Sequence, residues 1–277
     1  MVLRRLLLIL AAVLVTACGA TGGGPSITVG ADPEDVLLAH IYAAGLRYYG
    51  TAARVEASGD VLEALGAGKV SVAPGFTGRL LQRLDPESQA RSEEQVYRAL
   101  AGALPEGLAT ADYAVAAEDK PALAVTDTIA AGWGGRDLVA AVRHCAALRV
   151  GALSGTEPPG QIGSCALPAT RDYGDPTTLF GALSAGEINA AWTTTAGVTP
   201  PDGIVVLADR KPALVPAENV VALFRGNELD PMQLRAVNEI AGVLDTAALI
   251  DMRRKVQAGA DPQVVAEEWL AANPLGR

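Results

Sequence analysis

The sequence is poor in the side chains on which catalysis and metal binding most often depend. It holds only 2 histidines and 3 cysteines among 277 residues, and aromatic residues make up 4%. His40 and His144 stand far apart, with no second ligand at zinc spacing, so we expect no metal site and no cofactor. Ser154 lies outside any G-x-S-x-G turn and has no histidine placed to activate it, which argues against a serine hydrolase.

Net positive charge is also missing, and long apolar runs are confined to the N-terminus. The formal net charge is −9, and an acidic chain lacks the basic face that nucleic-acid binding requires. Beyond residue 17, charge or glycine interrupts every long apolar stretch, so we expect no transmembrane helix in the mature chain.

The N-terminus has the pattern of an export signal. Arg4 and Arg5 precede an apolar run over residues 6–15, which is too short for a comfortable membrane span but typical of a signal-peptide core. The run ends in Val-Thr-Ala before Cys18, which resembles the lipobox of bacterial lipoproteins. We therefore predict a lipoprotein signal peptide over residues 1–17, lipid attachment at Cys18 and a flexible tether over residues 18–26, placing the protein on the extracytoplasmic face of the cell membrane. An ordinary secretory signal with a chance cysteine is the alternative.

The two remaining cysteines form an even pair in an oxidising compartment. Cys145 and Cys165 are therefore predicted to form a disulfide, with two buried free thiols as the alternative.

Short β-type runs alternate with helical stretches along the mature chain, which predicts parallel sheets flanked by helices. Strands are expected over residues 27–30, 54–56, 70–73, 114–116, 148–151, 187–190 and 204–207. Helices are expected to start at Asp-Pro pairs, with Asp as N-cap and Pro at the first helical position. These pairs are Asp32-Pro33, Asp85-Pro86, Asp175-Pro176, Asp230-Pro231 and Asp261-Pro262.

One phrase occurs twice, about 118 residues apart. Residues 64–78 read ALGAGKVSVAPGFTG, and residues 182–197 read ALSAGEINAAWTTTAG. Each predicts a helix ending at Ala-Gly, a strand, and then a loop with an aromatic residue and threonine. Because ligands of open α/β sheets bind beyond the carboxyl ends of strands, the repeat predicts two lobes that each offer one such loop to a shared cleft. Chance recurrence in an alanine-rich chain is the alternative.

These stretches, together with ITVGADPEDVLLAHIYAAGLRYYG, ADYAVAAEDK and IVVLADRKPALVPAENVVALFR, resemble the glycine betaine/carnitine/choline-type substrate-binding proteins of ABC importers. The resemblance implies an α/β, two-lobed type II periplasmic-binding-protein fold, each lobe a mixed, mainly parallel sheet flanked by helices. It places residues 27–113 and 207–277 in lobe 1 and residues 114–206 in lobe 2. It further implies a monomer without enzymatic activity that closes around a small osmoprotectant-like solute, a quaternary amine or a relative, and delivers it to an ABC transporter permease.

The resemblance also implies a ligand site. A quaternary ammonium group is held against aromatic faces, and a carboxylate by basic groups or backbone N–H groups. The family's Y-T-G-T loop corresponds to Phe76, Thr77, Gly78 and Arg79 here, and its D-T-Y-A-L stretch contains Tyr113. The remaining positions implied for the site are Asp35, Trp192, Thr194 and Thr195, whereas Phe180 is expected in the core.

The family's usual basic residues near the crossover and after the VGA strand are absent here. Arg79 can replace them as a carboxylate anchor, Asp35 can bind a cationic head, or Asp35 and Arg79 can pair with each other. A further possibility is an envelope lipoprotein that keeps the fold but binds a different ligand or has a role outside transport. An enzyme on the same scaffold is disfavoured, because the site loops supply only Asp35 as a carboxylate.

Overall fold

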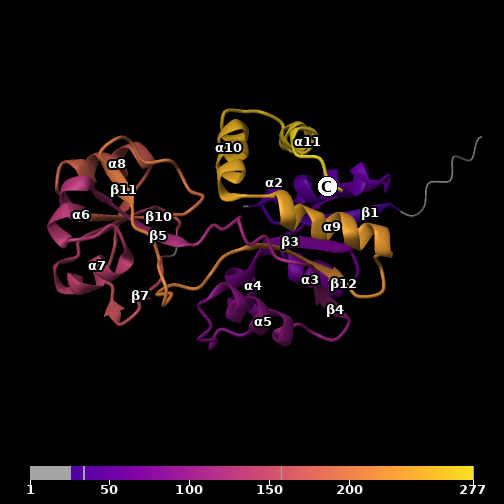
Figure 1. Ribbon diagram of the computed structural model, residues 1–277, viewed down its shortest axis with the longest axis horizontal. Helices are drawn as coiled ribbons and strands as arrows, with labels where there is room; N and C mark the ends of the chain where they lie inside the picture. Colours follow the sequence, from indigo (N-terminus) through magenta and orange to yellow (C-terminus); the bar gives the residue numbers. More distant parts are fainter. Residues whose placement is uncertain (1–25, 34, 157, 277) are drawn as a thin grey trace, which may run out of the picture.

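The computed structural model describes residues 26–33, 35–156 and 158–276 of the chain. Its strands form two five-stranded sheets, each flanked by helices and separated along the long axis of the molecule (Figure 1). The signal peptide predicted over residues 1–17, Cys18 and all but the last residue of the predicted tether lie outside the described residues.

The first sheet has the strand order β2-β1-β3-β12-β4. β1 runs parallel to β2 and β3, whereas β12 runs antiparallel to β3 and β4, so the sheet is mixed. Its strands are β1 (Ile27–Ala31), β2 (Ala53–Ala57), β3 (Val72–Phe76), β4 (Leu108–Thr110) and β12 (Val220–Arg225). β12 comes from a part of the chain far beyond β1–β4, so the sheet combines both ends of the sequence.

The helices around this sheet also come from both ends of the chain. α2 is almost wholly buried, because it packs on β1 and is covered by α9 and α11 from the C-terminus. We call these elements the first lobe. Its helices are α2 (Val36–Tyr48), α3 (Val61–Gly66), α4 (Thr77–Leu84), α5 (Glu93–Ala103), α9 (Pro231–Val243), α10 (Thr246–Gln257) and α11 (Pro262–Ala272). α10 lies on the side nearest the second sheet (Figure 1).

The second sheet has the order β11-β5-β10-β6-β9, with β10 parallel to β6 and antiparallel to β5. Its strands are β5 (Pro121–Thr126), β6 (Val150–Leu153), β9 (Arg171–Tyr173), β10 (Ala190–Thr194) and β11 (Ile204–Val206). The helices of this second lobe are α6 (Asp127–Trp133), α7 (Leu138–Arg143) and α8 (Pro176–Ser184), with a 3-10 turn over Cys145–Ala147. A small hairpin of β7 (Gln161–Ile162) and β8 (Cys165–Ala166) completes it.

Two chain segments connect the sheets, one between β4 and β5 and one between β11 and β12. They run side by side, because Glu118 bridges to Asn219 and the Asp119 N–H donates to the Glu218 carbonyl at 2.9 Å. The Asn219 side chain also donates to the Ala114 carbonyl at 3.0 Å. We call these segments the crossovers. The predicted lobe boundaries at 113/114 and 206/207 fall within or at the edge of them, and as boundaries they stay a prediction.

Several local predictions hold. Asp175, Asp230 and Asp261 each cap a helix that begins with the following proline. The disulfide between Cys145 and Cys165 is confirmed, and Phe180 lies in the core of the second lobe. Among the described residues, no helix is long and apolar enough to cross a bilayer.

Other local predictions are wrong. The strand expected over residues 114–116 is a turn in the first crossover, and the strand forms at β5 instead. α2 begins after Asp35 rather than at Asp32, and Asp85-Pro86 follows a helix instead of starting one. The site loops are also regular structure: Phe76 ends β3, and Trp192 and Thr194 belong to β10. Neighbouring strands and helices, which the local sequence does not reveal, decide these cases.

Candidate ligand-binding site

Two arginines and two aspartates meet beside Phe76, and we call Asp35, Arg79, Asp119 and Arg253 the arginine–aspartate cluster. Arg79 contacts Asp35 at 3.5 Å and Asp119 at 3.2 Å. Arg253 contacts Asp35 at 3.2 Å and Asp119 at 2.8 Å. Each aspartate therefore binds both arginines, so the four side chains form a closed ring of ion pairs.

The members of the cluster come from distant parts of the fold. Asp35 is the residue before α2, Arg79 lies in the first turn of α4, and Arg253 projects from α10. Asp119 lies in the first crossover, where it also accepts a hydrogen bond from the Ala196 N–H at 3.2 Å. Ala196 follows β10, so the cluster joins three elements of the first lobe to the crossover and to the end of a second-lobe strand.

The carboxylates are more deeply buried than the arginines. The side chains of Asp35 and Asp119 are 11% and 4% exposed, against 41% for Arg79 and 22% for Arg253. Burial raises the pKa of Asp35, and the two arginines oppose that rise. Burial alone would lower the pKa of Arg79, but nearby carboxylates, including Glu218 and both aspartates, outweigh it and raise that pKa. The arginines thus oppose the effect of burial on Asp35, and the carboxylates oppose the effect of burial on Arg79.

Glu218 lies beneath the cluster at the start of α4. Its carboxylate accepts a hydrogen bond from the backbone N–H of Arg79 at 3.0 Å, a typical position for an anion at the N-terminus of a helix. Burial raises the pKa of Glu218 to about 7, although hydrogen bonds from the helix and the charge of Arg79 act against this. Only glycine at position 78 allows this close approach, because a Cβ there would meet the Ala217 carbonyl at 2.6 Å and the Glu218 carboxylate at 2.8 Å.

Both guanidinium groups lie near the ring of Phe76. The centre of the Arg79 guanidinium is 4.7 Å from the ring centroid, and that of Arg253 is 5.6 Å away. Both distances are within the range of favourable cation–π interaction. Phe76 itself is only 1% exposed. Phe76, one of the three aromatic residues that the sequence places in the site, is therefore covered by cations of the protein.

Two of the predicted site threonines hold the crossovers. The Thr77 hydroxyl donates to the Ala217 carbonyl at 3.3 Å and accepts the Asn219 N–H at 3.0 Å. The Thr195 hydroxyl accepts the Lys120 N–H at 3.0 Å and donates to the Glu118 carbonyl at 3.2 Å. The two Thr-containing ends of the repeated phrase thus fasten one crossover each.

The remaining predicted site residues do not reach the cluster. Trp192 is 5% exposed and packs in the core of the second lobe, where its Nε1 has no hydrogen-bond partner among the described residues. Tyr113 is half-buried against the ring of Tyr97, at 4.7 Å between centroids. Thr194 lies at the end of β10 opposite Pro121. The structure therefore brings together Asp35, Phe76, Thr77 and Arg79, and separates Trp192 and Tyr113 from them.

Three residues of this region are missing from the sequence-based prediction: Asp119, Glu218 and Arg253. Arg253 stands in the basic run Arg-Arg-Lys of α10, and its partner Asp35 is 218 residues away, so no local signal identifies it. Asp119 and Glu218 lie within stretches that carry the family resemblance, but nothing in the sequence shows that either acid is buried.

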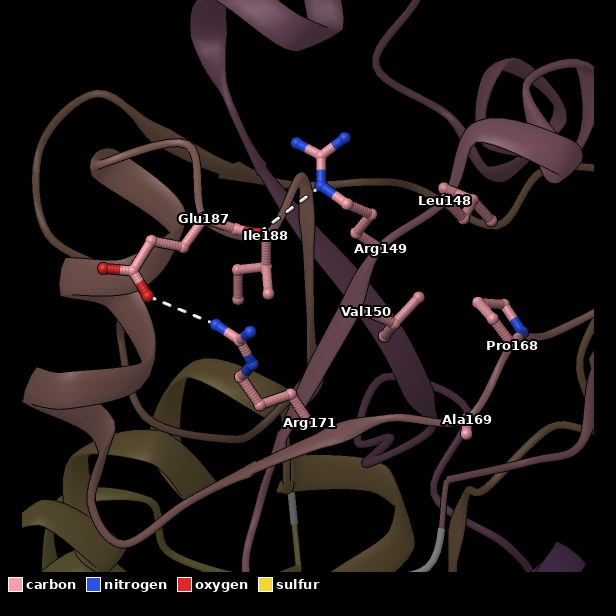
Figure 2. A pocket seen from close by; sticks show the side chains of 8 residues that line it. All are labelled: Leu148, Arg149, Val150, Pro168, Ala169, Arg171, Glu187 and Ile188. Atoms are coloured by element: carbon pink, nitrogen blue, oxygen red, sulfur yellow. Dashed lines mark hydrogen bonds and ion pairs between the residues drawn. The ribbon is translucent and has the colours of Figure 1, made fainter.

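A surface hollow of about 210 Å³ lies elsewhere, at the edge of the second sheet (Figure 2). Its charged groups are already engaged: Arg171 pairs with Glu187 at 3.3 Å, and Arg149 donates to the Gly186 carbonyl at 3.1 Å. None of its lining residues belongs to the arginine–aspartate cluster. Within the described part of the chain, no group of three or more His, Cys, Asp or Glu side chains is arranged to hold a metal ion.

Comparison with known families confirms the resemblance drawn from the sequence. Residues 174–272 match the model of the substrate-binding domain of ABC-type glycine betaine transport systems. This is a family of binding domains, in line with the expectation of a non-enzymatic protein. No curated protein matches the chain.

Solved structures extend the similarity to almost the whole chain. Apo YehZ from Escherichia coli is 17% identical, with 91% of this chain and 99% of that chain covered and a TM-score of 0.68. A glycine betaine/carnitine/choline ABC transporter protein is also 17% identical, with 89% and 98% covered and a TM-score of 0.68. A choline-binding protein of an ABC transporter, in complex with choline, is 15% identical, with 90% of this chain and 89% of that chain covered and a TM-score of 0.55. The chain therefore has the two-lobed fold of type II periplasmic binding proteins.

Proposed function

We propose that this chain, which has the two-lobed binding-protein fold and matches a substrate-binding domain over residues 174–272, captures a small solute outside the cytoplasmic membrane and delivers it to an ABC transporter permease. The solute is osmoprotectant-like: a quaternary amine or a related molecule. The protein acts as a monomer that closes around the solute.

The arginine–aspartate cluster is the observation that carries this proposal. It joins the start of α2, α4 and α10 of the first lobe to the first crossover and, through the Ala196 carbonyl at 3.1 Å from Arg253, to the end of β10. A solute held there touches the elements on which a change in the angle between the lobes depends. Closure about such a hinge is an established way for binding proteins to hold a ligand.

A solute screen tests this function. Betaines, choline, carnitine, amines, amino acids and polyols are added to the mature protein, and thermal unfolding is followed. A ligand at a hundred times its dissociation constant should stabilise the folded state by about 2.7 kcal/mol. Arg253→Ala, which removes one guanidinium of the cluster, should abolish the response, whereas Arg254→Ala, which removes an exposed arginine of the same helix that pairs with Asp251, should preserve it.

A flat response across the whole panel would contradict the proposal. It would favour the alternative, an envelope lipoprotein that keeps this fold but has a different ligand or a role outside transport. The departures from the family pattern, with Arg79 after Gly78 and no arginine after the VGA strand, support that alternative.

We further propose that a lipid on Cys18 anchors the protein to the extracytoplasmic face of the membrane. Several acyl chains together hold a protein stably, because each buried methylene contributes about 0.8 kcal/mol. In a bacterial host fed labelled palmitate, the full chain should carry label and sediment with membranes, and Cys18→Ser should lose both properties. Labelled Cys18→Ser protein in the membrane fraction would rule out this anchor.

A further inference from the structure

We propose that Arg79 and Arg253 act as built-in cations that close the face of Phe76 to quaternary ammonium groups, so that the solute is bound through a carboxylate or similar acceptor group. This inference rests on the proposed function and narrows the class of solute. Three features of the arginine–aspartate cluster lead to it.

The aromatic face is already occupied. Both guanidinium groups lie within 5.6 Å of the Phe76 centroid, and the ring is 1% exposed. A quaternary ammonium group gains its affinity from close contact with an open aromatic face. To reach this ring, it would have to displace an arginine that is held by two ion pairs.

The carboxylates are also fully engaged. One oxygen of Asp35 binds Arg253 and the other binds Arg79. One oxygen of Asp119 binds the Ala196 N–H, and the other binds both arginines. With side chains only 11% and 4% exposed, these acids present little surface to a cationic solute.

The arginines, in contrast, keep hydrogen-bond donors in reserve. A guanidinium has five N–H donors in a planar fork that matches a carboxylate. Among the described residues, the Nε–H of Arg79 and that of Arg253 donate to no acceptor. Arg79 is the most exposed member of the cluster, at 41% of its side chain. The N–H groups of the cluster that remain unused can therefore donate to acceptor groups of a solute.

Arg79→Thr tests the proposal by uncovering the aromatic face of Phe76. The short side chain uncovers one approach to Phe76 and frees one oxygen of Asp35. The probes are choline and glycine betaine, which share a trimethylammonium group and differ in carrying a hydroxyl or a carboxylate. By isothermal titration, Arg79→Thr should bind choline about tenfold more tightly than the wild type, because the uncovered ring of Phe76 then offers a cation–π contact to the trimethylammonium group. The ratio of betaine to choline affinity should fall by a similar factor.

Two control variants accompany this experiment. Arg83→Thr changes an arginine of the same helix that pairs with Asp60, away from Phe76, and should leave choline binding as in the wild type. Phe76→Leu in the Arg79→Thr background should abolish the gained choline binding. Circular dichroism checks the fold, and Arg79→Ala, with its higher helix propensity, replaces the threonine variant if that variant is unfolded.

The inference is overturned if wild type binds choline as tightly as Arg79→Thr does, or if neither protein binds choline. An unchanged betaine-to-choline ratio overturns the carboxylate part alone. If the solute panel yields a ligand while these results fail, the proposed function stands without the inference. If the panel is flat for both proteins, the proposed function fails as well.

Discussion

Replacing Asp119 with asparagine is expected to lower the free energy of unfolding by about 3–5 kcal/mol, as the loss of one partner of a buried ion pair typically does. The Asp119 side chain is 4% exposed and accepts from Arg79 at 3.2 Å and from Arg253 at 2.8 Å. An asparagine amide of the same shape has no charge, and its NH2 group replaces either the oxygen that accepts from both guanidinium groups or the oxygen that accepts the Ala196 N–H. Two half-buried cations then share the single carboxylate of Asp35.

Urea denaturation of the mature protein measures this effect. Asp127→Asn is the matched control, because Asp127 pairs with Arg136 at 2.7 Å with both side chains at least half exposed. Exposed ion pairs contribute about 1 kcal/mol or less to stability, so the free energy of unfolding of the control should remain close to that of the wild type. Equal losses for the two variants would show that burial of the cluster does not govern its contribution to stability.

Removing the disulfide with Cys145→Ser and Cys165→Ser together is expected to cost about 3 kcal/mol. The bond closes a loop between positions 20 residues apart, and a loop of this length restricts the unfolded chain by that amount. It also fixes the β7–β8 hairpin to the chain that follows α7, with Cys165 buried in the second-lobe core.

Chemical denaturation with and without a thiol reductant checks this value. Reductant should destabilise wild type by about as much as the double substitution does, and should leave the double variant unchanged. If reduced and oxidised wild type unfold at the same denaturant concentration, the disulfide contributes nothing to stability under those conditions.

Part of the fold follows from local sequence. The Asp-Pro pairs at 175, 230 and 261 start helices because an aspartate side chain accepts hydrogen bonds from the first free N–H groups of the same helix. Cys145 and Cys165 pair as their number and compartment predict. The alternation of strands and helices, itself a local property, predicts sheets flanked by helices, whereas the two lobes are predicted from the repeated phrase and the family resemblance.

The position of Trp192 shows where local reasoning ends. The pattern places an aromatic residue after a short strand and suggests a loop facing a ligand. In the structure β10 continues through Trp192, because β5 pairs with it and sets Trp192 opposite Leu123. Alternate residues of a strand face opposite sides of the sheet, so this register directs Trp192 into one core and Ala191 into the other.

By itself, the sequence determined the pairing of the two cysteines, the start of three helices and the closeness of Phe76 and Arg79 along the chain, and it predicts the compartment. Only the tertiary structure decided that Arg253 and Asp119 complete the cluster around them. The physical reason is the distance along the chain: Asp35 and Arg253 are 218 residues apart, and their contact exists only where α10 packs back beside the first crossover. Charges so far apart carry no local pattern, yet once they are buried together each must find its counterion.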